Sequence, residues 1–287
     1  MSARSDTARL RANLGENLIA LESGDGARAL LSRLGGQLLS WQPARGRERL
    51  YLSERAILDG SQPIRGGVPI IFPRFADSPA KYPALPRHGL VRQRVWDLDT
   101  VRNEDDYALC VLRLGGAPIG AWPHAWELEL SVCIGGDRVD TELAIRNLGA
   151  EMFDCQCALH TYLRIVETHT ARVLGLHAHR YQDRVSATEG VEEASELHIE
   201  SELDRIYFDV EGTLTLDEPG RMLAIQATGF PDVVVWNPWR RRCGELTDMP
   251  PDGYRHMLCI EAAHVGRPLP VAPGAEWIAR QTLVALR

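Results

Sequence analysis

The chain has 287 residues, of which 45% are hydrophobic and 25% are charged, and its formal net charge is −7. This composition is that of a globular protein with a sizeable core, and it argues against a disordered chain. The acidic balance also argues against bulk nucleic-acid binding, which requires a basic surface. An anionic ligand would therefore have to be met by a local cluster of arginines.

The first residues of the chain carry charges at Arg4, Asp6 and Arg9. They are not followed by an apolar stretch of the length that a signal peptide or a membrane helix needs. We therefore expect a soluble, cytoplasmic protein with no membrane partner. The six cysteines show no Cys-x-x-Cys spacing. Free buried thiols are expected rather than disulfides or zinc ligands.

Strand patterns dominate the sequence, and no segment shows a sustained helical stripe. Residues 126–134 and 139–145 alternate apolar and polar side chains around a Gly-Gly-Asp turn, which is typical of a β-hairpin. Further strands are predicted in chain order at 28–41, 50–54, 94–114, 171–175, 211–216, 221–228, 232–236, 256–262 and 275–286. Their number predicts an all-β fold, a large and mainly antiparallel sandwich.

Residues 60–92 interrupt this pattern, because their six prolines exclude regular central strands. An irregular segment of this length inside a compact domain usually serves function. No linker, repeat or low-complexity tract divides the chain. Residues 1–287 are therefore expected to form one domain.

His160 lies in a predicted strand, 153–165, whose apolar residues alternate with polar ones. The alternation places His160 on one face with Asp154, Gln156, Tyr162 and Arg164. A solvated face is the commoner use of such a strand. The mixed chemistry of these groups, which include one that exchanges protons near neutral pH, favours a functional site.

Two loops bring three arginines close in sequence to glycines. Arg65 precedes Gly66-Gly67, which permits positive φ or a close backbone approach. Arg87 and Arg92 flank a His-Gly pair at His88. Arginine forks bind phosphate or carboxylate in a bidentate manner, so these loops are candidates for an anion site. Surface arginines paired with local acids remain the alternative.

A carboxylate interrupts an apolar strand near the C-terminus, at Glu261 within Met257–Ala262. It is either an exposed residue at a strand end or a desolvated group with a raised pKa, suited to act as a general base. Upstream, Trp236 and Trp239 flank an Asn-Pro pair. Their rings could face a sugar, although core packing is the commoner use of tryptophan. Residues 240–242, three arginines in a row, are expected to form a solvated loop, with a second anion contact as the alternative.

Six segments, in sequence order, resemble the glucose-6-phosphate 1-epimerase branch of the aldose 1-epimerase family. They are RGGVPIIFP (65–73), PRHGLVR (86–92), ALHTYLRI (158–165), LDRIY (203–207), VVWNPW (234–239) and CIEAAH (259–264). The resemblance implies a galactose-mutarotase-like β-supersandwich. It also implies an enzyme that interconverts the α and β anomers of a hexose 6-phosphate without a metal or other cofactor.

The same resemblance implies roles for individual residues. The family's catalytic histidine, a general acid at the ring oxygen, falls on His160, and its catalytic glutamate, a base at the anomeric hydroxyl, falls on Glu261. The implied substrate-binding residues are Arg65, Arg87, His88, Arg92 and Asp204. Arg87 replaces a glutamine of related proteins, and its extra positive charge would tighten phosphate binding.

Ring opening removes a proton from the anomeric hydroxyl and adds one to the ring oxygen, so an acid and a base are expected on opposite sides of one small group. Two alternatives stay open. One is an epimerase of unphosphorylated hexoses, in which the arginine loops are structural. The other is a sugar-binding protein without turnover, which has no need of an acid and base pair. The expected partner is a small phosphosugar, and a monomer is expected.

Overall fold

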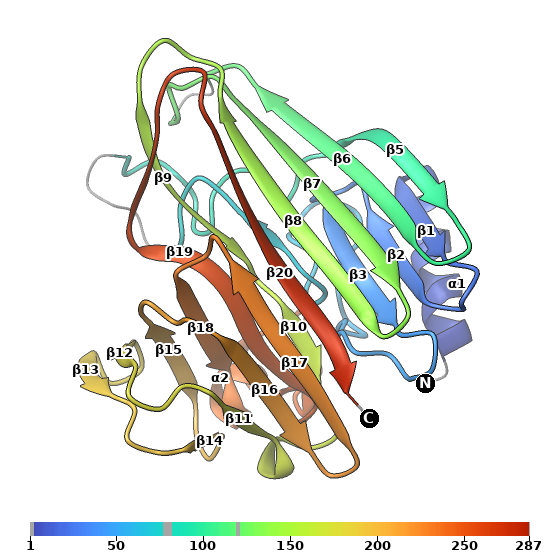
Figure 1. The fold of residues 1–287 in the computed structure, drawn as a ribbon, viewed down its shortest axis with the longest axis vertical. Helices are drawn as coiled ribbons and strands as arrows, with labels where there is room; N and C mark the ends of the chain where they lie inside the picture. The colour runs from blue at the N-terminus through green and yellow to red at the C-terminus, as the bar shows by residue number, and fades with distance from the viewer. Residues whose placement is uncertain (1–2, 77–81, 119–120, 287) are drawn as a thin grey trace.

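The structure is a computed structural model that describes residues 3–76, 82–118 and 121–286. Two large antiparallel sheets lie against each other, and a small sheet and a helix lie beside them at the N-terminal end (Figure 1). One hydrophobic cluster contains buried side chains from both large sheets, such as Leu130, Val235 and Ile260. The predicted all-β sandwich is therefore confirmed.

One large sheet has nine strands, and its two edge strands are β14 and β5. In sheet order its strands are β14 (Glu196–His198), β11 (Arg172–Leu174), β16 (Thr213–Glu218), β17 (Arg221–Thr228), β20 (Glu276–Leu286), β8 (Arg138–Asn147), β7 (Trp126–Gly135), β6 (Ala108–Gly116) and β5 (Asp97–Asn103).

The other large sheet has eight strands, and its central strands carry most of the residues discussed below. In sheet order they are β13 (Thr188–Val191), β12 (Arg180–Asp183), β15 (Leu203–Tyr207), β18 (Asp232–Asn237), β19 (Met257–Val271), β9 (Phe153–Leu159) and β4 (Ile70–Ile71), with β10 (Tyr162–Arg164) pairing to β19. The small sheet comprises β1 (Leu18–Glu22), β2 (Arg28–Ser32) and β3 (Gln37–Gln42).

Helices are short and lie outside the sheets. They are α1 (Ala3–Leu14) and α2 (Trp239–Glu245), with 3₁₀ turns η1 (Gly15–Asn17), η2 (Thr168–Thr170) and η3 (Gly253–His256). None of the helices in the described part of the chain has the length and apolar character needed to cross a membrane.

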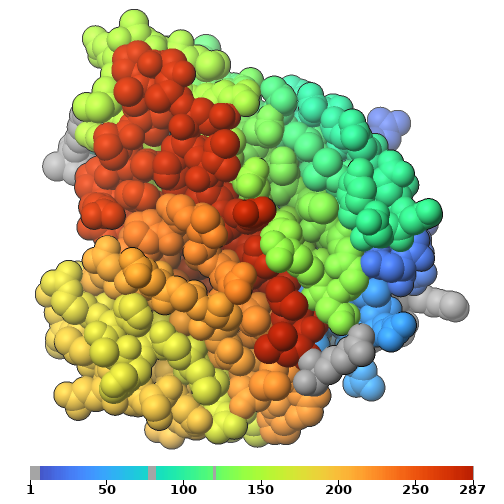
Figure 2. Space-filling view, viewed as in Figure 1, coloured from blue at the N-terminus to red at the C-terminus, as the bar shows by residue number. Residues whose placement is uncertain are grey.

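Strand alternation decides which side chains enter the core. Along β7 every second residue is buried, from Trp126 to Ile134, while the residues between them are only partly buried. This is the pattern of a strand with one face on the core. The face of the molecule seen in Figure 2 carries the strands β5 to β8 in green, the C-terminal strands in red, and segments of both large sheets between β11 and β18 in yellow and orange.

The structure corrects several sequence-based boundaries. The segments 28–41 and 94–114 are each two strands joined by a turn, and 50–54 forms only isolated bridges at Leu50 and Leu52. The sequence patterns predict neither α1 nor α2. The arginines at 240–242 lie in α2 rather than in a loop. Pro238 has helical φ and ψ of −70° and −13°, and the Asn237 side-chain oxygen accepts from the Trp239 amide at 2.8 Å, which satisfies a free N–H at the start of the helix. Residues 60–92 are irregular apart from β4, and 77–81 lie outside the described residues.

The glycine pair after Arg65 packs tightly against two neighbouring segments. Gly66 and Gly67 have φ values of +118° and +63°. A Cβ at Gly67 would collide with the carbonyl oxygen of Leu38, and one at Gly66 with that of Tyr51. The Gly67 amide also donates to Tyr51 O at 2.7 Å. Both uses of glycine that the sequence suggested occur here, and they fix the backbone from which Arg65 projects.

Replacing Gly67 with alanine should destabilise the protein more than replacing Gly274, which has a similar φ of +71° and nothing within 4 Å of its Cβ position. Gly274→Ala tests the backbone strain alone, roughly 1–2 kcal/mol. Gly67→Ala adds a collision with backbone and should cost at least about 2 kcal/mol more. Urea unfolding of both variants measures the difference, and equal losses would contradict this packing.

Candidate active site

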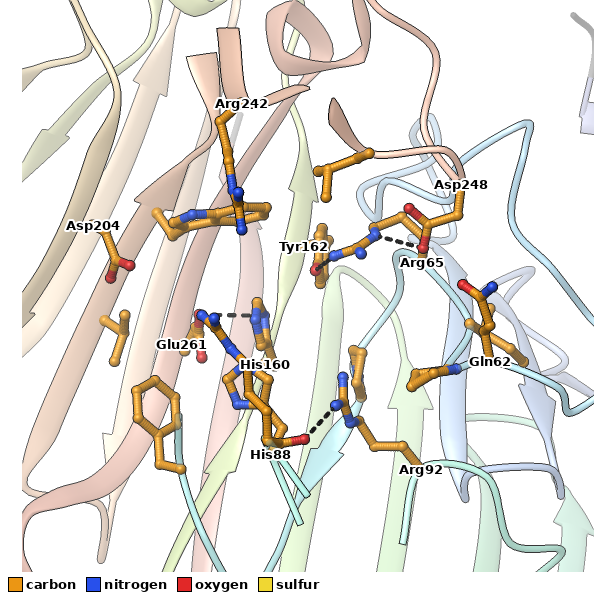
Figure 3. Close-up of a pocket in the computed structure, with 18 of the residues that line it drawn as sticks. Gln62, Arg65, His88, Arg92, His160, Tyr162, Asp204, Arg242, Asp248 and Glu261 are labelled. Atoms are coloured by element: carbon orange, nitrogen blue, oxygen red, sulfur yellow. Dashed lines mark hydrogen bonds and ion pairs between the residues drawn. The ribbon is translucent and has the colours of Figure 1, made fainter. Parts of the chain in front are cut away.

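His160 and Glu261 face each other across two strands. In the antiparallel register, Leu159 pairs with Ala262 and Tyr162 pairs with Cys259. The same register places His160 opposite Glu261. Side chains of directly opposite residues on one face of a sheet lie within contact distance of each other. Nδ1 of His160 lies 3.2 Å from Oε1 of Glu261 (Figure 3).

The predicted strand 153–165 is broken at this point into β9 and β10. The backbone of the irregular segment takes over the pairing, because the His160 amide donates to Pro69 O at 2.9 Å and the Tyr162 amide to Gly67 O at 2.8 Å. On the opposite face, the Thr161 hydroxyl donates to Oε1 of Gln281 on β20, at 2.5 Å. Hydrogen bonds to two different segments thus stabilise the break, and the His160 side chain lies on the polar face that the alternation predicted.

Burial dominates the electrostatics of this pair. His160 is 9% exposed and Glu261 is 1% exposed. Burial raises the pKa of Glu261 well above its ordinary value, and the nearby Asp204 carboxylate acts in the same direction. Burial also lowers the pKa of His160 well below its ordinary value, with Arg92 and Arg65 adding to the effect. Without a ligand, the pair is therefore most stable with both groups uncharged.

The pair lies in a cavity of about 550 Å³. All seven predicted site residues line it, although they come from five separate segments: Arg65, Arg87, His88, Arg92, His160, Asp204 and Glu261. The irregular segment 60–92 supplies four of them, as expected of a functional loop. The sheet supplies the other three.

Arg65 and Arg92 differ in their surroundings. Arg65 donates from Nε to Asp248 at 3.1 Å and from Nη1 to the Tyr162 hydroxyl at 3.0 Å. Arg92 donates to the Arg87 carbonyl oxygen at 2.9 Å. Burial, opposed in part by Tyr162 and helped by Arg65 and Arg87, lowers the pKa of Arg92 to about 10. An anion beside Arg92 would therefore relieve an unfavourable charge.

His88 has a strained backbone, with φ of +64°, next to Gly89 at +80°. A Cβ at Gly89 would collide with the Phe72 carbonyl oxygen, so this turn sits tightly on the irregular segment. The His88 ring contacts the His160 ring edge to face, with centroids 5.7 Å apart. Burial and the His160 ring lower the pKa of His88, which makes it a neutral wall of the cavity. Strain of this kind in a non-glycine residue is typical of functional sites.

Asp204 and Trp236 form the wall opposite the arginine loops. They are directly paired between β15 and β18, and Val234 on β18 pairs with Glu261 on β19. The floor of the cavity is thus a set of neighbouring positions on one sheet face. Burial raises the pKa of Asp204, partly offset by Arg184 and Arg87.

The residues that line the cavity beyond the seven predicted ones include Tyr162, Arg184, Trp236, Arg242 and Asp248. Sequence reasoning noted Tyr162 and Trp236 only as features of their segments, gave an anion contact only as the alternative for Arg242, and did not single out Arg184 or Asp248. Tyr162 stacks on the His160 ring with centroids 4.8 Å apart. It could have been found from the same alternation that placed His160. Arg242 points toward the pair from α2 (Figure 3) and donates to Glu245 at 2.9 Å. Only the helical conformation brings it there.

Among the described residues, one group has the ligand types of a metal site, namely His160, Cys259 and Glu261, whose ligand atoms all lie within 4.8 Å of one another. All six cysteines are free, and all but Cys133 are buried, as expected.

The structure is thus a two-sheet antiparallel sandwich with a buried histidine and glutamate pair in an arginine-rich cavity, which has the size of sites for small ligands. The family model described as aldose 1-epimerase matches residues 17–283. The chain belongs to this family.

Two similar proteins bear the provisional name glucose-6-phosphate 1-epimerase. The one from Cenchrus ciliaris is 32% identical over 88% of this chain and 79% of its own length. The one from Escherichia coli K12 is 30% identical over 80% of this chain and 77% of its own length. A crystal structure described provisionally as a mutarotase, YeaD from Salmonella typhimurium, superposes with a TM-score of 0.84 at 27% identity, over 91% of this chain and 88% of that one.

Glu261→Gln should stabilise the folded protein, because it removes a carboxylate that folding buries. The folded-state pKa lies above the unfolded one, so the wild type loses stability as pH rises from the unfolded value toward the folded value, at about 1.4 kcal/mol per pH unit. The advantage of the variant should grow over that window. Free energies of unfolding in urea at several pH values measure it, and an advantage independent of pH would show that Glu261 is not desolvated.

Proposed function

We propose that the protein interconverts the α and β anomers of a hexose 6-phosphate, with D-glucose 6-phosphate as the substrate we expect. The observation that carries this proposal is the buried His160 and Glu261 pair at the centre of an arginine-lined cavity. The names of the relatives, which describe them provisionally as glucose-6-phosphate 1-epimerases, support the same substrate.

The reaction needs one proton removed and one proton supplied at two oxygens bonded to the same carbon. Glu261 takes the proton of the anomeric hydroxyl, and His160 gives a proton to the ring oxygen, so that the C1–O5 bond breaks and the open-chain aldehyde forms. Rotation about C1–C2 presents the other carbonyl face. The two proton transfers then run in reverse and close the ring as the other anomer.

The two groups lie side by side rather than on opposite sides of the substrate. At 3.2 Å nothing fits between them, so the sugar presents its anomeric edge to both from the cavity. This arrangement suits the reaction, because the two oxygens share one carbon. Each group then reaches one oxygen without a large movement of the substrate.

The pair holds one proton in either of its states, on the carboxyl or on the imidazole. Burial favours the uncharged state when no sugar is bound. A hydroxyl that donates to the carboxylate and a ring oxygen that accepts from the imidazolium stabilise the charged state instead. The substrate thus selects the state in which Glu261 is a base and His160 an acid.

The phosphate group is held by the arginine loops in this proposal. Arg92 is the main contact, since its charge is destabilised by burial and by two neighbouring arginines. Arg65 is fixed in place by Asp248 and Tyr162 and adds a second fork. Arg87, exposed at the cavity rim, supplies further positive charge.

The remaining sugar hydroxyls face the sheet. Asp204 accepts hydrogen bonds from them, and Trp236 offers an apolar edge to the ring. His88 contributes a neutral polar contact beside His160. The cavity, at about 550 Å³, is within the range of small-molecule sites.

In an epimerase of unphosphorylated hexoses the partly buried charge of Arg92 would meet no anion, whereas a phosphate compensates it. A binding protein without turnover has no use for a buried acid and base pair, which costs stability.

We also propose that the chain forms one domain and is a monomer in the cytoplasm. One continuous core cluster, with members from Ile19 to Ala285, supports the first of these statements.

His160→Ala and Glu261→Gln should each lower kcat for anomerisation of glucose 6-phosphate by about 10²–10⁴-fold, because each removes one proton-transfer group. Polarimetry from a pure anomer measures the rate after subtraction of the spontaneous reaction. Thermal unfolding of each variant verifies that it is folded. A folded variant that turns over at the wild-type rate would refute the assigned roles.

Arg65→Ala and Arg92→Ala should raise KM for glucose 6-phosphate by about tenfold or more, the loss expected for charge-assisted hydrogen bonds. KM for free glucose should change far less. Arg102→Ala, an exposed arginine on β5 of the opposite sheet, serves as the control and should change neither value. Equal effects on both sugars would show that the two arginines do not contact the phosphate.

A further inference from the structure

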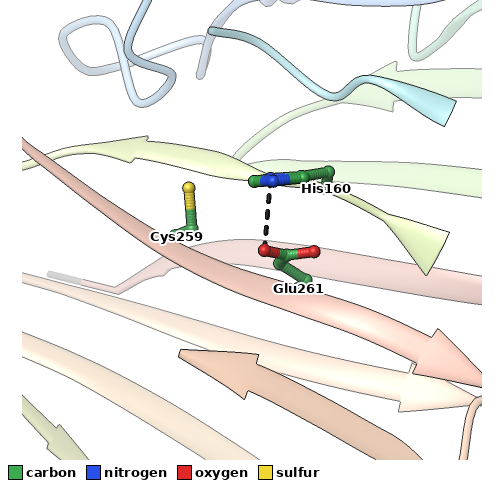
Figure 4. Close-up of side chains that lie close together, drawn as sticks. All are labelled: His160, Cys259 and Glu261. Atoms are coloured by element: carbon green, nitrogen blue, oxygen red, sulfur yellow. Dashed lines mark ion pairs between the residues drawn. The ribbon is translucent and has the colours of Figure 1, made fainter. Parts of the chain in front are cut away.

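Three metal-ligand side chains stand on one face of the eight-stranded sheet. Cys259 and Glu261 are two residues apart on β19. His160 lies opposite Glu261, at the break between β9 and β10, which both pair with β19. The thiol, the carboxylate and the imidazole lie together in Figure 4, and their ligand atoms are within 4.8 Å of one another. The anomerase chemistry proposed above uses two of them and leaves the thiol without a role.

The polar atoms of this group are poorly satisfied. His160 Nδ1 and Glu261 Oε2 are buried and have no hydrogen-bond partner among the described residues. The His160 contact with Oε1 at 3.2 Å brings the groups close without hydrogen-bond alignment. Buried polar atoms without partners are uncommon, and a site for an ion is one of their standard explanations.

The spacing suits a small tetrahedral cation. With bonds of about 2.0–2.3 Å to nitrogen, oxygen and sulfur, two ligands of a zinc ion lie about 3.4–3.6 Å apart. The His160 and Glu261 atoms are already at 3.2 Å, and the third ligand atom is at most 4.8 Å from either. Binding therefore requires the ligand atoms to draw closer together by a small movement of the side chains. His160 and Glu261 line the cavity, whereas Cys259 is fully buried and does not, so an ion at this site would be open to the cavity only on the side of His160 and Glu261.

The charge balance is also favourable. A divalent cation bound by a thiolate, a carboxylate and a neutral imidazole gives a group with no net charge, so its burial carries no uncompensated charge. Binding releases the thiol proton and the proton held by the His160 and Glu261 pair to solvent. A thiolate ligand favours Zn²⁺ over Mg²⁺ or Ca²⁺, which prefer oxygen.

We propose that His160, Cys259 and Glu261 form an inhibitory site for Zn²⁺ on the floor of the cavity. The ion occupies the lone pairs that the acid and the base need for proton transfer, so the loaded protein does not turn over. The inhibitory consequence rests on the proposed anomerase function, whereas the binding itself does not.

The test is zinc binding by isothermal titration calorimetry, together with the absorption spectrum of the Co²⁺-loaded protein, in which a thiolate ligand gives a ligand-to-metal charge-transfer band. The protein is stripped with chelator and kept reduced. The wild type should bind one zinc ion and show the thiolate band. Anomerisation of glucose 6-phosphate should stop when one equivalent is bound and return when a chelator is added.

Cys259→Ser keeps the volume of the side chain and removes a strong ligand. It should keep the anomerisation rate in chelator, weaken zinc binding by about 10²-fold or more and abolish the charge-transfer band. Cys259→Ala serves as a second variant should the serine protein fold poorly. Cys133→Ala, at the half-buried cysteine of the other sheet, is the matched control and should behave as the wild type.

Two results would overturn the site. Either the wild type binds no zinc, or Cys259→Ser binds zinc and is inhibited as the wild type is. A protein that binds zinc through Cys259 but accelerates no sugar phosphate would retain the site and refute the proposed function. A protein that is active yet binds no zinc gives the first of these results, which would retain the function and refute the site.

Discussion

The site depends on the register in which β19 pairs with the two consecutive strands β9 and β10. This register places His160 opposite Glu261 and Tyr162 opposite Cys259, so two catalytic candidates and their neighbours meet on one face. A shift of one residue would send Glu261 to the opposite face of the sheet. The buried apolar residues on that other face, such as Leu163 and Ile260, prevent such a shift, so packing of the core fixes the geometry of the site.

The irregular segment 60–92 converts this sheet face into a cavity. Its backbone pairs with residues 160 and 162 at the strand break, and its arginines then stand over the pair. The glycines allow that close approach. Burial disfavours the charge on both His160 and Glu261, while the arginines favour an anion nearby. A phosphorylated sugar satisfies both conditions at once, because it brings the anion and supplies the two oxygens that stabilise the charged pair.

Much of the fold was predictable from local patterns, because period-two alternation in segments such as 126–134 reports directly on which face is buried. The same alternation placed His160 on a polar face. Register between distant strands leaves no local signal, so only the family resemblance, and no pattern in the residues, indicated that His160 and Glu261 act together. The helical position of Arg242 could not be predicted, because α2 is too short to show a periodic stripe. The proximity of Cys259 to His160 also depends on register, so the sequence indicated no more than a buried thiol there.

The assigned residue roles all depend on one property, the acceleration of anomer interchange of a phosphorylated sugar. Magnetisation-exchange NMR of glucose 6-phosphate and of glucose, in parallel and with and without the protein, tests it most directly, since it reports exchange at equilibrium between the two anomeric signals. The acceleration for the phosphate ester should far exceed any for the free sugar. Acceleration of neither sugar would contradict the proposed reaction, and equal acceleration of both would contradict the role of the arginine loops.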